Sequence, residues 1–140
     1  MTTPATPSDS YFRKGFGLGA QVKADLAADY SGHVVDLLRE RDYTLEAGGL
    51  TVRLAREFGF CYGVDRAVEY AYQSRKKFPD RRTFLLGEII HNPHVNANMR
   101  RMGIEILSPL DGVHDGEPRF DLSVVGAEDV VILPAFGVTV

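Results

Sequence analysis

The segment REFGFCYGVDRAVEYAY, residues 56–72, places the only cysteine of the chain between two glycines and the start of a helix. Gly59 and Gly63 favour a tight turn around Cys61. After the turn, apolar residues recur at helical spacing, namely Val64, Ala67, Val68, Ala71 and Tyr72. Before the turn, residues 50–55 (LTVRLA) alternate and contain β-branched side chains, which predicts a strand. Strand, turn and helix form one unit of an α/β fold.

The same unit is repeated further along the chain. Residues 83–90 (TFLLGEII) predict a second strand. Residues 91–103 (HNPHVNANMRRMG) predict a helix with Asn92 as the N-cap, Pro93 at the first helical position and Gly103 as the terminating residue. Two consecutive strand-and-helix units are typical of a parallel sheet.

Two more strands complete the predicted sheet. They are residues 104–107 (IEIL) and 129–137 (DVVILPAFG), and the residues between them, 108–120, contain Asp-Gly pairs that predict loop or hairpin turns. We therefore expect an α/β fold with a small, mostly parallel sheet of about four strands, flanked by helices.

Three regions of different composition divide the chain. Residues 1–10 are small, polar and proline-containing, so we expect them to be disordered. Residues 11–48 form an N-terminal extension, in which apolar residues at three- and four-residue steps from 21 to 41 predict one amphipathic helix. The EAGG segment ends that pattern, and residues 49–140 form the α/β domain.

Composition limits the classes of function. The 140 residues are 44% hydrophobic and 25% charged, which fits one compact domain. A net charge of −3 gives no reason to expect nucleic acid or an anionic membrane as a partner. A single cysteine excludes an intrachain disulfide, and no apolar run approaches the roughly 20 residues that span a bilayer. The first ten residues lack signal and transit features, so we predict a cytoplasmic location.

The residues that could take part in binding or catalysis all follow predicted strands: Cys61, His91, Asn92, Phe136 and Gly137. Ligands of open parallel sheets bind beyond the carboxyl ends of the strands. The helix that follows Cys61 favours its thiolate, which binds metals or attacks electrophiles; the alternative is a small, buried apolar residue. His91 and the amides of the next helix could bind a phosphate; the alternative is that His91 only caps that helix.

Two other motifs are weaker. Glu88, His91 and His94 approach the spacing of a zinc signature. Pro93, however, places the two histidines at a strand-to-helix corner and not on one helix face, so we do not predict zinc. The glycines around Cys61 match neither the dinucleotide-binding fingerprint nor a phosphate-binding P-loop.

Three motifs in order, GFCYGVDRAV, GEIIHNPHVN and VVILPAFGV, resemble the N-terminal part of the 4-hydroxy-3-methylbut-2-enyl diphosphate reductase family, also called IspH or LytB. The block YFRKGFG and the helix before LTVRLAREFGFC are similar to the longer form of the family found in cyanobacteria and plastids. The resemblance covers essentially everything after residue 10.

The resemblance implies an iron–sulfur oxidoreductase of isoprenoid biosynthesis. The family reduces an allylic alcohol diphosphate to isopentenyl and dimethylallyl diphosphates, with electrons from a donor such as ferredoxin or flavodoxin. In the family, the cysteine that corresponds to Cys61 is one of three that hold a 4Fe-4S cluster, and the histidine that corresponds to His91 binds the substrate diphosphate. Thiolates are the ligands that such clusters require.

Two departures from the family pattern matter. Many bacterial members have histidine where this chain has Phe136, so we do not count Phe136 as a ligand. The other two cluster cysteines, a second histidine and a proton-relaying glutamate belong to later domains of the family, and this chain ends at Val140 before them. We therefore expect the first domain of a reductase, natural or truncated, with no catalytic residue, no complete cluster and no activity alone. Surface that the later domains would cover favours self-association.

Two other classes of function stay open. A thiol enzyme would use Cys61 as nucleophile and His91 as base, provided that the two lie within hydrogen-bond reach. A binding module would capture diphosphates at the start of the Asn92 helix, with His91 as a donor.

Overall fold

The computed structural model describes residue 12, residues 15–110 and residues 120–134. This part of the chain contains both helices and strands, with a parallel sheet and helices at the N-terminal side, which confirms the predicted α/β class. Four predictions lie outside the described residues, namely the disorder of residues 1–10, the turns at 111–119 and the positions of Phe136 and Gly137.

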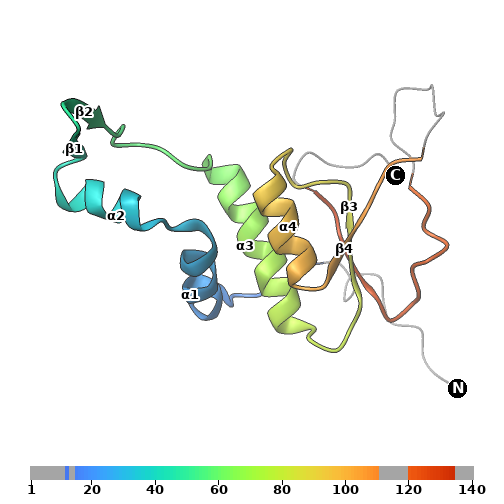
Figure 1. Ribbon diagram of the computed structural model, residues 1–140. Helices are drawn as coiled ribbons and strands as arrows, with labels where there is room; N and C mark the ends of the chain where they lie inside the picture. The colour runs from blue at the N-terminus through green and yellow to red at the C-terminus, as the bar shows by residue number, and fades with distance from the viewer. Residues whose placement is uncertain (1–11, 13–14, 111–119, 135–140) are drawn as a thin grey trace, which may run out of the picture.

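A parallel sheet forms the centre of the described structure. Its strands β3 (Thr83–Leu86), β4 (Ile104–Leu107) and β5 (Val130–Ile132) have the order β4-β3-β5. Every residue of β3 is buried, as expected of the central strand in a parallel sheet. Helices α3 (Tyr62–Lys77) and α4 (Pro93–Arg101) pack side chains into the same core and both begin at the end of the sheet where β3 finishes (Figure 1).

The predicted strand at residues 50–55 does form, but its predicted place in the parallel sheet was wrong. Strand β2 (Leu50–Arg53) pairs antiparallel with β1 (Thr44–Ala47) in a separate hairpin. The two residues between them, Gly48 and Gly49, have φ values of 56° and 79°. Two consecutive positive φ angles are the requirement of a tight two-residue hairpin turn, so the glycine pair favours a local hairpin. The parallel sheet therefore has three strands in the described residues and not about four.

The predicted single helix at residues 21–41 is two helices. Helix α1 (Gly19–Tyr30) ends at Ser31, which is extended, and α2 (His33–Glu40) begins after Gly32, which is also extended. Helix α2 and the β1–β2 hairpin, which we call the arm, project away from the sheet and from α3 and α4 (Figure 1). Only α1 of the two helices packs into the core, through the buried Val22.

The last turn of α1 is attached to both α3 and α4 by polar contacts with Asp29. The Tyr72 hydroxyl of α3 donates to the Asp29 carboxylate. Nη2 of Arg101, at the end of α4, lies 2.5 Å from the other carboxylate oxygen. Nε2 of His94, in the first turn of α4, lies 2.8 Å from the Asp29 carbonyl oxygen. Burial first, and then the hydrogen bond to Asp29, raises the pKa of Tyr72 far above its ordinary value, so the hydroxyl keeps its proton and continues to donate.

A second polar contact fixes β5. Arg82 precedes β3 and Asp129 precedes β5, and their side chains form a two-pronged ion pair with distances of 3.0 Å (Nε to Oδ1) and 2.5 Å (Nη2 to Oδ2). The backbone amide of Gly126 also donates to Asp129, at 2.7 Å. The hydrogen bond from Arg82, followed by that from Gly126, holds the pKa of Asp129 below its usual value.

We expect V22A to lower the free energy of unfolding by about 2 kcal/mol, because Val22 is 1% exposed and its methyl groups fill the core between α1 and α3. The matched control is V34A, at a side chain of the arm that is 59% exposed, for which we expect a change within about 0.5 kcal/mol. Urea unfolding measures both values. Equal effects of the two substitutions would contradict the packing of α1.

We expect D129N to lower stability near pH 7 and to have a smaller effect in acid. A carboxyl group with a lowered folded-state pKa stabilises the fold above its unfolded pKa of about 3.9, and this contribution disappears as the pH falls through the folded value. Urea unfolding of wild type and D129N at pH 7, pH 5 and pH 3 measures the difference. A difference that is independent of pH would show that the ion pair with Arg82 has no such role.

Candidate functional site

Cys61 occupies the N-cap position of α3 and is exposed. Its backbone oxygen accepts the first helical hydrogen bond, from Asp65 at 3.0 Å, but its side chain caps no amide. The preceding Gly59 has a φ of 106°, a conformation that favours glycine and lets the chain turn from the arm into α3. The thiol therefore stands at the positive end of a 16-residue helix, with access to solvent and to any soft metal.

His91 lies at the corner between β3 and α4. The neighbouring Ile89 is 2% exposed and anchors the corner in the core, whereas the His91 side chain is 98% exposed. Nδ1 of His91 lies 2.9 Å from Oε2 of Glu88. The structure thus presents His91 as a fully accessible imidazole whose Nε2 faces no protein partner among the described residues.

The start of α4 is already capped, as the sequence predicts. Oδ1 of Asn92 accepts from the amides of His94, at 2.9 Å, and Val95, at 3.2 Å, and Pro93 at the first position has no N–H group. A phosphate at this corner would therefore have to displace the Asn92 side chain in order to use these amides. His91 can bind an anion here without them.

His91, before α4, and His94, in its first turn, do not converge on one ligand site. Nε2 of His94 contacts the carbonyl oxygen of Asp29, and its ring packs edge-on against Tyr30, with ring centroids 5.7 Å apart. Nδ1 of His91 is occupied by Glu88 and not by the thiol of Cys61. In residues 15–110 and 120–134 there is no group of three or more His, Cys, Asp or Glu side chains that could hold a metal ion.

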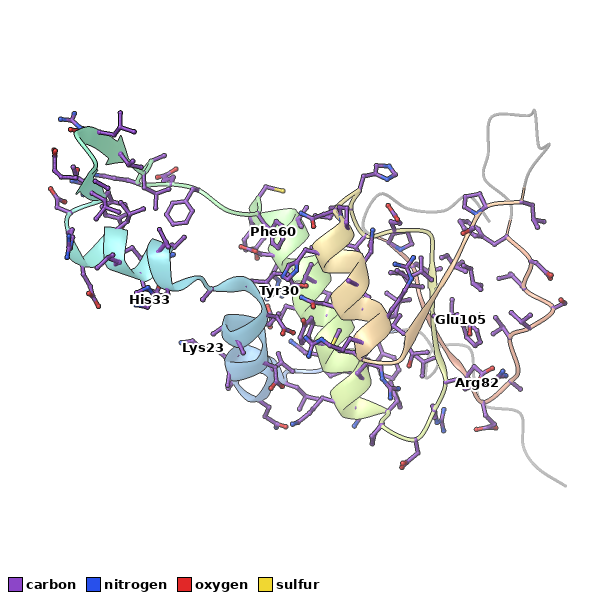
Figure 2. All side chains as sticks on the ribbon, in the orientation of Figure 1. Lys23, Tyr30, His33, Phe60, Arg82 and Glu105 are labelled. Carbon is purple, nitrogen blue, oxygen red and sulfur yellow. The ribbon has the colours of Figure 1, made fainter. Side chains whose placement is uncertain are left out.

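Tyr30 packs against residues next to both candidate positions, a role that was not predicted from the sequence. Its ring packs edge-on against Phe60, which precedes Cys61, with centroids 5.6 Å apart, and against His94 in the first turn of α4. Figure 2 shows Tyr30 and Phe60 close together at the side of α3. Cys61 and His91 therefore lie at the same end of the molecule, where α3 and α4 begin (Figure 1).

The predicted position of Cys61 relative to the parallel sheet was wrong. We expected Cys61 at the carboxyl end of a strand of the parallel sheet, but the strand before it belongs to the arm. Cys61 is instead placed by the start of α3 and by the contact between Phe60 and Tyr30. His91 does follow β3, as predicted.

A groove of about 820 Å³ runs along α3 from Gly63, near its start, to Phe78, just past its end, and neither Cys61 nor His91 is in its lining. It is bounded by one face of α3, including Gly63 and Ala67, and by the stretch from Ala127 to Pro134 that contains β5. Two arginines, Arg66 and Arg81, are also in its lining.

No helix in the described part of the chain is both long enough and apolar enough to cross a membrane.

The chain is similar to curated proteins named 4-hydroxy-3-methylbut-2-enyl diphosphate reductase. The relative from Nostoc punctiforme is 47% identical over 133 residues, which are 95% of this chain and 32% of the relative. The relative from Gloeobacter violaceus is 50% identical over 130 residues, or 93% of this chain and 31% of the relative. The relative from Trichodesmium erythraeum is 42% identical over all 140 residues, or 33% of its own length. No solved structure matches the chain.

These matches extend through the N-terminal extension, and the chain spans about a third of the length of the curated relatives it matches. The family model described as LytB protein matches residues 52–140, which include Cys61 and His91. The chain therefore belongs to the LytB protein family.

Proposed function

We propose that these 140 residues form the N-terminal part of a 4-hydroxy-3-methylbut-2-enyl diphosphate reductase. The relatives that carry this name support the proposal, and they match almost the whole chain. The observation that carries it is the exposed, uncapped Cys61 at the start of α3, inside the segment that matches the family. The proposed reaction consumes two electrons and two protons, breaks the allylic C–O bond and releases the oxygen as water.

The donor set of the chain fits a 4Fe-4S cluster in part. Cys61 supplies one soft, accessible sulfur at the start of α3. The chain has no other cysteine, so the remaining thiolates have to come from outside these 140 residues. When bound, the cluster would deliver electrons and offer an open iron position to the substrate oxygen.

His91 is the proposed ligand of the substrate diphosphate. Its exposed imidazole lies at the end of the molecule where Cys61 also lies, which suits a small substrate whose hydroxyl and diphosphate ends are bound separately. We further propose ferredoxin or flavodoxin as the electron donor and the cytoplasm as the location. A boundary between residues 48 and 49, as expected from the sequence, would divide the β1–β2 hairpin, so we propose that the α/β domain begins after β2, with α1 packed on it.

A chimera tests this proposal. The 140-residue chain is joined to the part of the Nostoc punctiforme relative that follows the matched segment, and the cluster is reconstituted without oxygen. We expect iron and sulfide near a full cluster and turnover of the allylic diphosphate, because the missing thiolates are then present. C61S should lose the cluster and the activity, and H91A should keep the cluster but raise KM at least about tenfold.

Two outcomes would contradict the assignments. A C61S chimera that retains both cluster and turnover would remove Cys61 from the ligand set. An H91A chimera with an unchanged KM would remove His91 from the diphosphate site. The control variant is T51K in the arm, which we expect to leave both readouts unchanged, since Thr51 is an exposed residue of β2.

We also propose that the isolated chain self-associates through the arm. Four large apolar side chains of the arm and of the segment that follows it are exposed: Val34 (59%), Leu50 (69%), Val52 (46%) and Phe58 (41%). Leu50 and Val52 alternate with Thr51 and Arg53, so they share one face of β2. An exposed apolar face of this kind favours burial against a second molecule.

Sedimentation velocity of wild type, V52K and T51K tests the self-association. V52K places a charge on the apolar face of β2, so we expect its dimer dissociation constant to rise at least about tenfold. T51K places the same charge on the opposite face and should leave the constant within about twofold of wild type. A wild-type chain that is monomeric at 100 µM, or equal effects of the two lysines, would refute this role of the arm.

A further inference from the structure

The contact between Glu88 and His91 is not used by the proposed function. Oε2 of Glu88 lies 2.9 Å from Nδ1 of His91, while the His91 side chain is 98% exposed and that of Glu88 is 36% exposed. Because both side chains are exposed, the Glu88–His91 pair adds little to the stability of the fold. Its consequence is therefore local, because it determines which nitrogen of the imidazole carries a proton.

The corner holds Glu88 in a defined place. Ile89 is buried in the core, and the amide of Gly87 donates to the carbonyl oxygen of Leu107 at 3.0 Å. On the other side, the amide of Asn92 donates to the carbonyl oxygen of Ile90 at 2.8 Å. Because the backbone is fixed on both sides of Glu88, the carboxylate is presented to the ring by a rigid turn.

A carboxylate accepts hydrogen bonds and donates none, so its contact with Nδ1 requires a proton on that nitrogen. In the neutral ring, Nε2 then carries a lone pair and cannot donate to a diphosphate oxygen, which is itself an acceptor. Only the imidazolium donates through both nitrogens at once, to Glu88 and to the diphosphate. Among the described residues, Glu88 is the only side chain that forms an ion pair with the His91 ring, and the ring of His94 contacts Asp29 and Tyr30 instead.

We propose that Glu88 is a positioning residue that fixes His91 in the Nδ1–H form, so that His91 binds a diphosphate oxygen through Nε2 only when it takes up a proton. The identity of the ligand, a diphosphate, rests on the proposed function. The tautomer of the His91 ring does not depend on it. It adds Glu88 to the residues that determine how the substrate is bound, and it makes binding of the diphosphate more favourable in mild acid.

The state of the ring is measured without ligand. Nitrogen-15 NMR of the labelled 140-residue chain at pH 8 distinguishes the two neutral tautomers, and H91N assigns the signal of His91. We expect the Nδ1–H form in wild type and a shift of the population toward the Nε2–H form in E88A. The matched control is E105A, at a glutamate of β4 (Figure 2), which should leave the tautomer of His91 unchanged.

The ligand is then tested with inorganic pyrophosphate at pH 6 and pH 8. We expect the affinity at pH 6 divided by the affinity at pH 8 to be at least about fivefold larger in wild type than in E88A. The reason is that the neutral His91 ring of E88A can still donate through Nε2. Titration of pyrophosphate itself cancels in this comparison. An unchanged tautomer in E88A, or equal ratios in both proteins, would overturn the positioning role. A tautomer change without any binding of pyrophosphate by wild type would overturn His91 as the diphosphate ligand and confirm the action of Glu88 on the ring.

Discussion

The attachment of α1 to α3 and α4 is the constraint on which the arrangement of the candidate site depends. Asp29 accepts from Tyr72 and Arg101 through its carboxylate and contacts His94 through its carbonyl oxygen. These contacts hold the last turn of α1 against both helices. Tyr30 is then in place to pack against Phe60 and His94, the neighbours of the two candidate positions. An extension outside the segment matched by the family model thus positions residues inside it.

The N-terminus of α4 is capped by a side chain and that of α3 is not, and this difference determines which groups are available to bind a ligand. The amides of α4 are satisfied by Asn92, which makes this helix start a structural feature with His91 exposed beside it. The start of α3 has a thiol where a capping oxygen usually stands, and the thiol makes no capping contact. A sulfur at that position, with no capping contact, keeps its lone pairs free for a metal. Loss of a cap costs about 1 kcal/mol, which is small beside the roughly 5–15 kcal/mol stability typical of a folded domain.

Much of the fold could be predicted where the signal is local. The buried strand β3, the cap at Asn92, Pro93 at the first position of α4 and the helix after Cys61 all follow from short patterns, and the structure confirms them. The break at Ser31 and Gly32 was missed because apolar spacing continues across it, although the glycine was a sign of it. The hairpin was missed because Gly48 and Gly49 were interpreted as the end of a helix and not as a turn between strands. The role of Tyr30 depends on contacts between distant segments, which periodicity does not contain.

The most direct test of the central claim is the iron and acid-labile sulfide content of the 140-residue chain after anaerobic reconstitution, with sedimentation to define its oligomeric state. We predict no stoichiometric 4Fe-4S cluster on the monomer, since Cys61 is the only thiol and the described residues bring no further metal-binding group to it. A stable cluster with about four irons per monomeric chain would refute this prediction, because a single thiol cannot supply the thiolates that such a cluster requires.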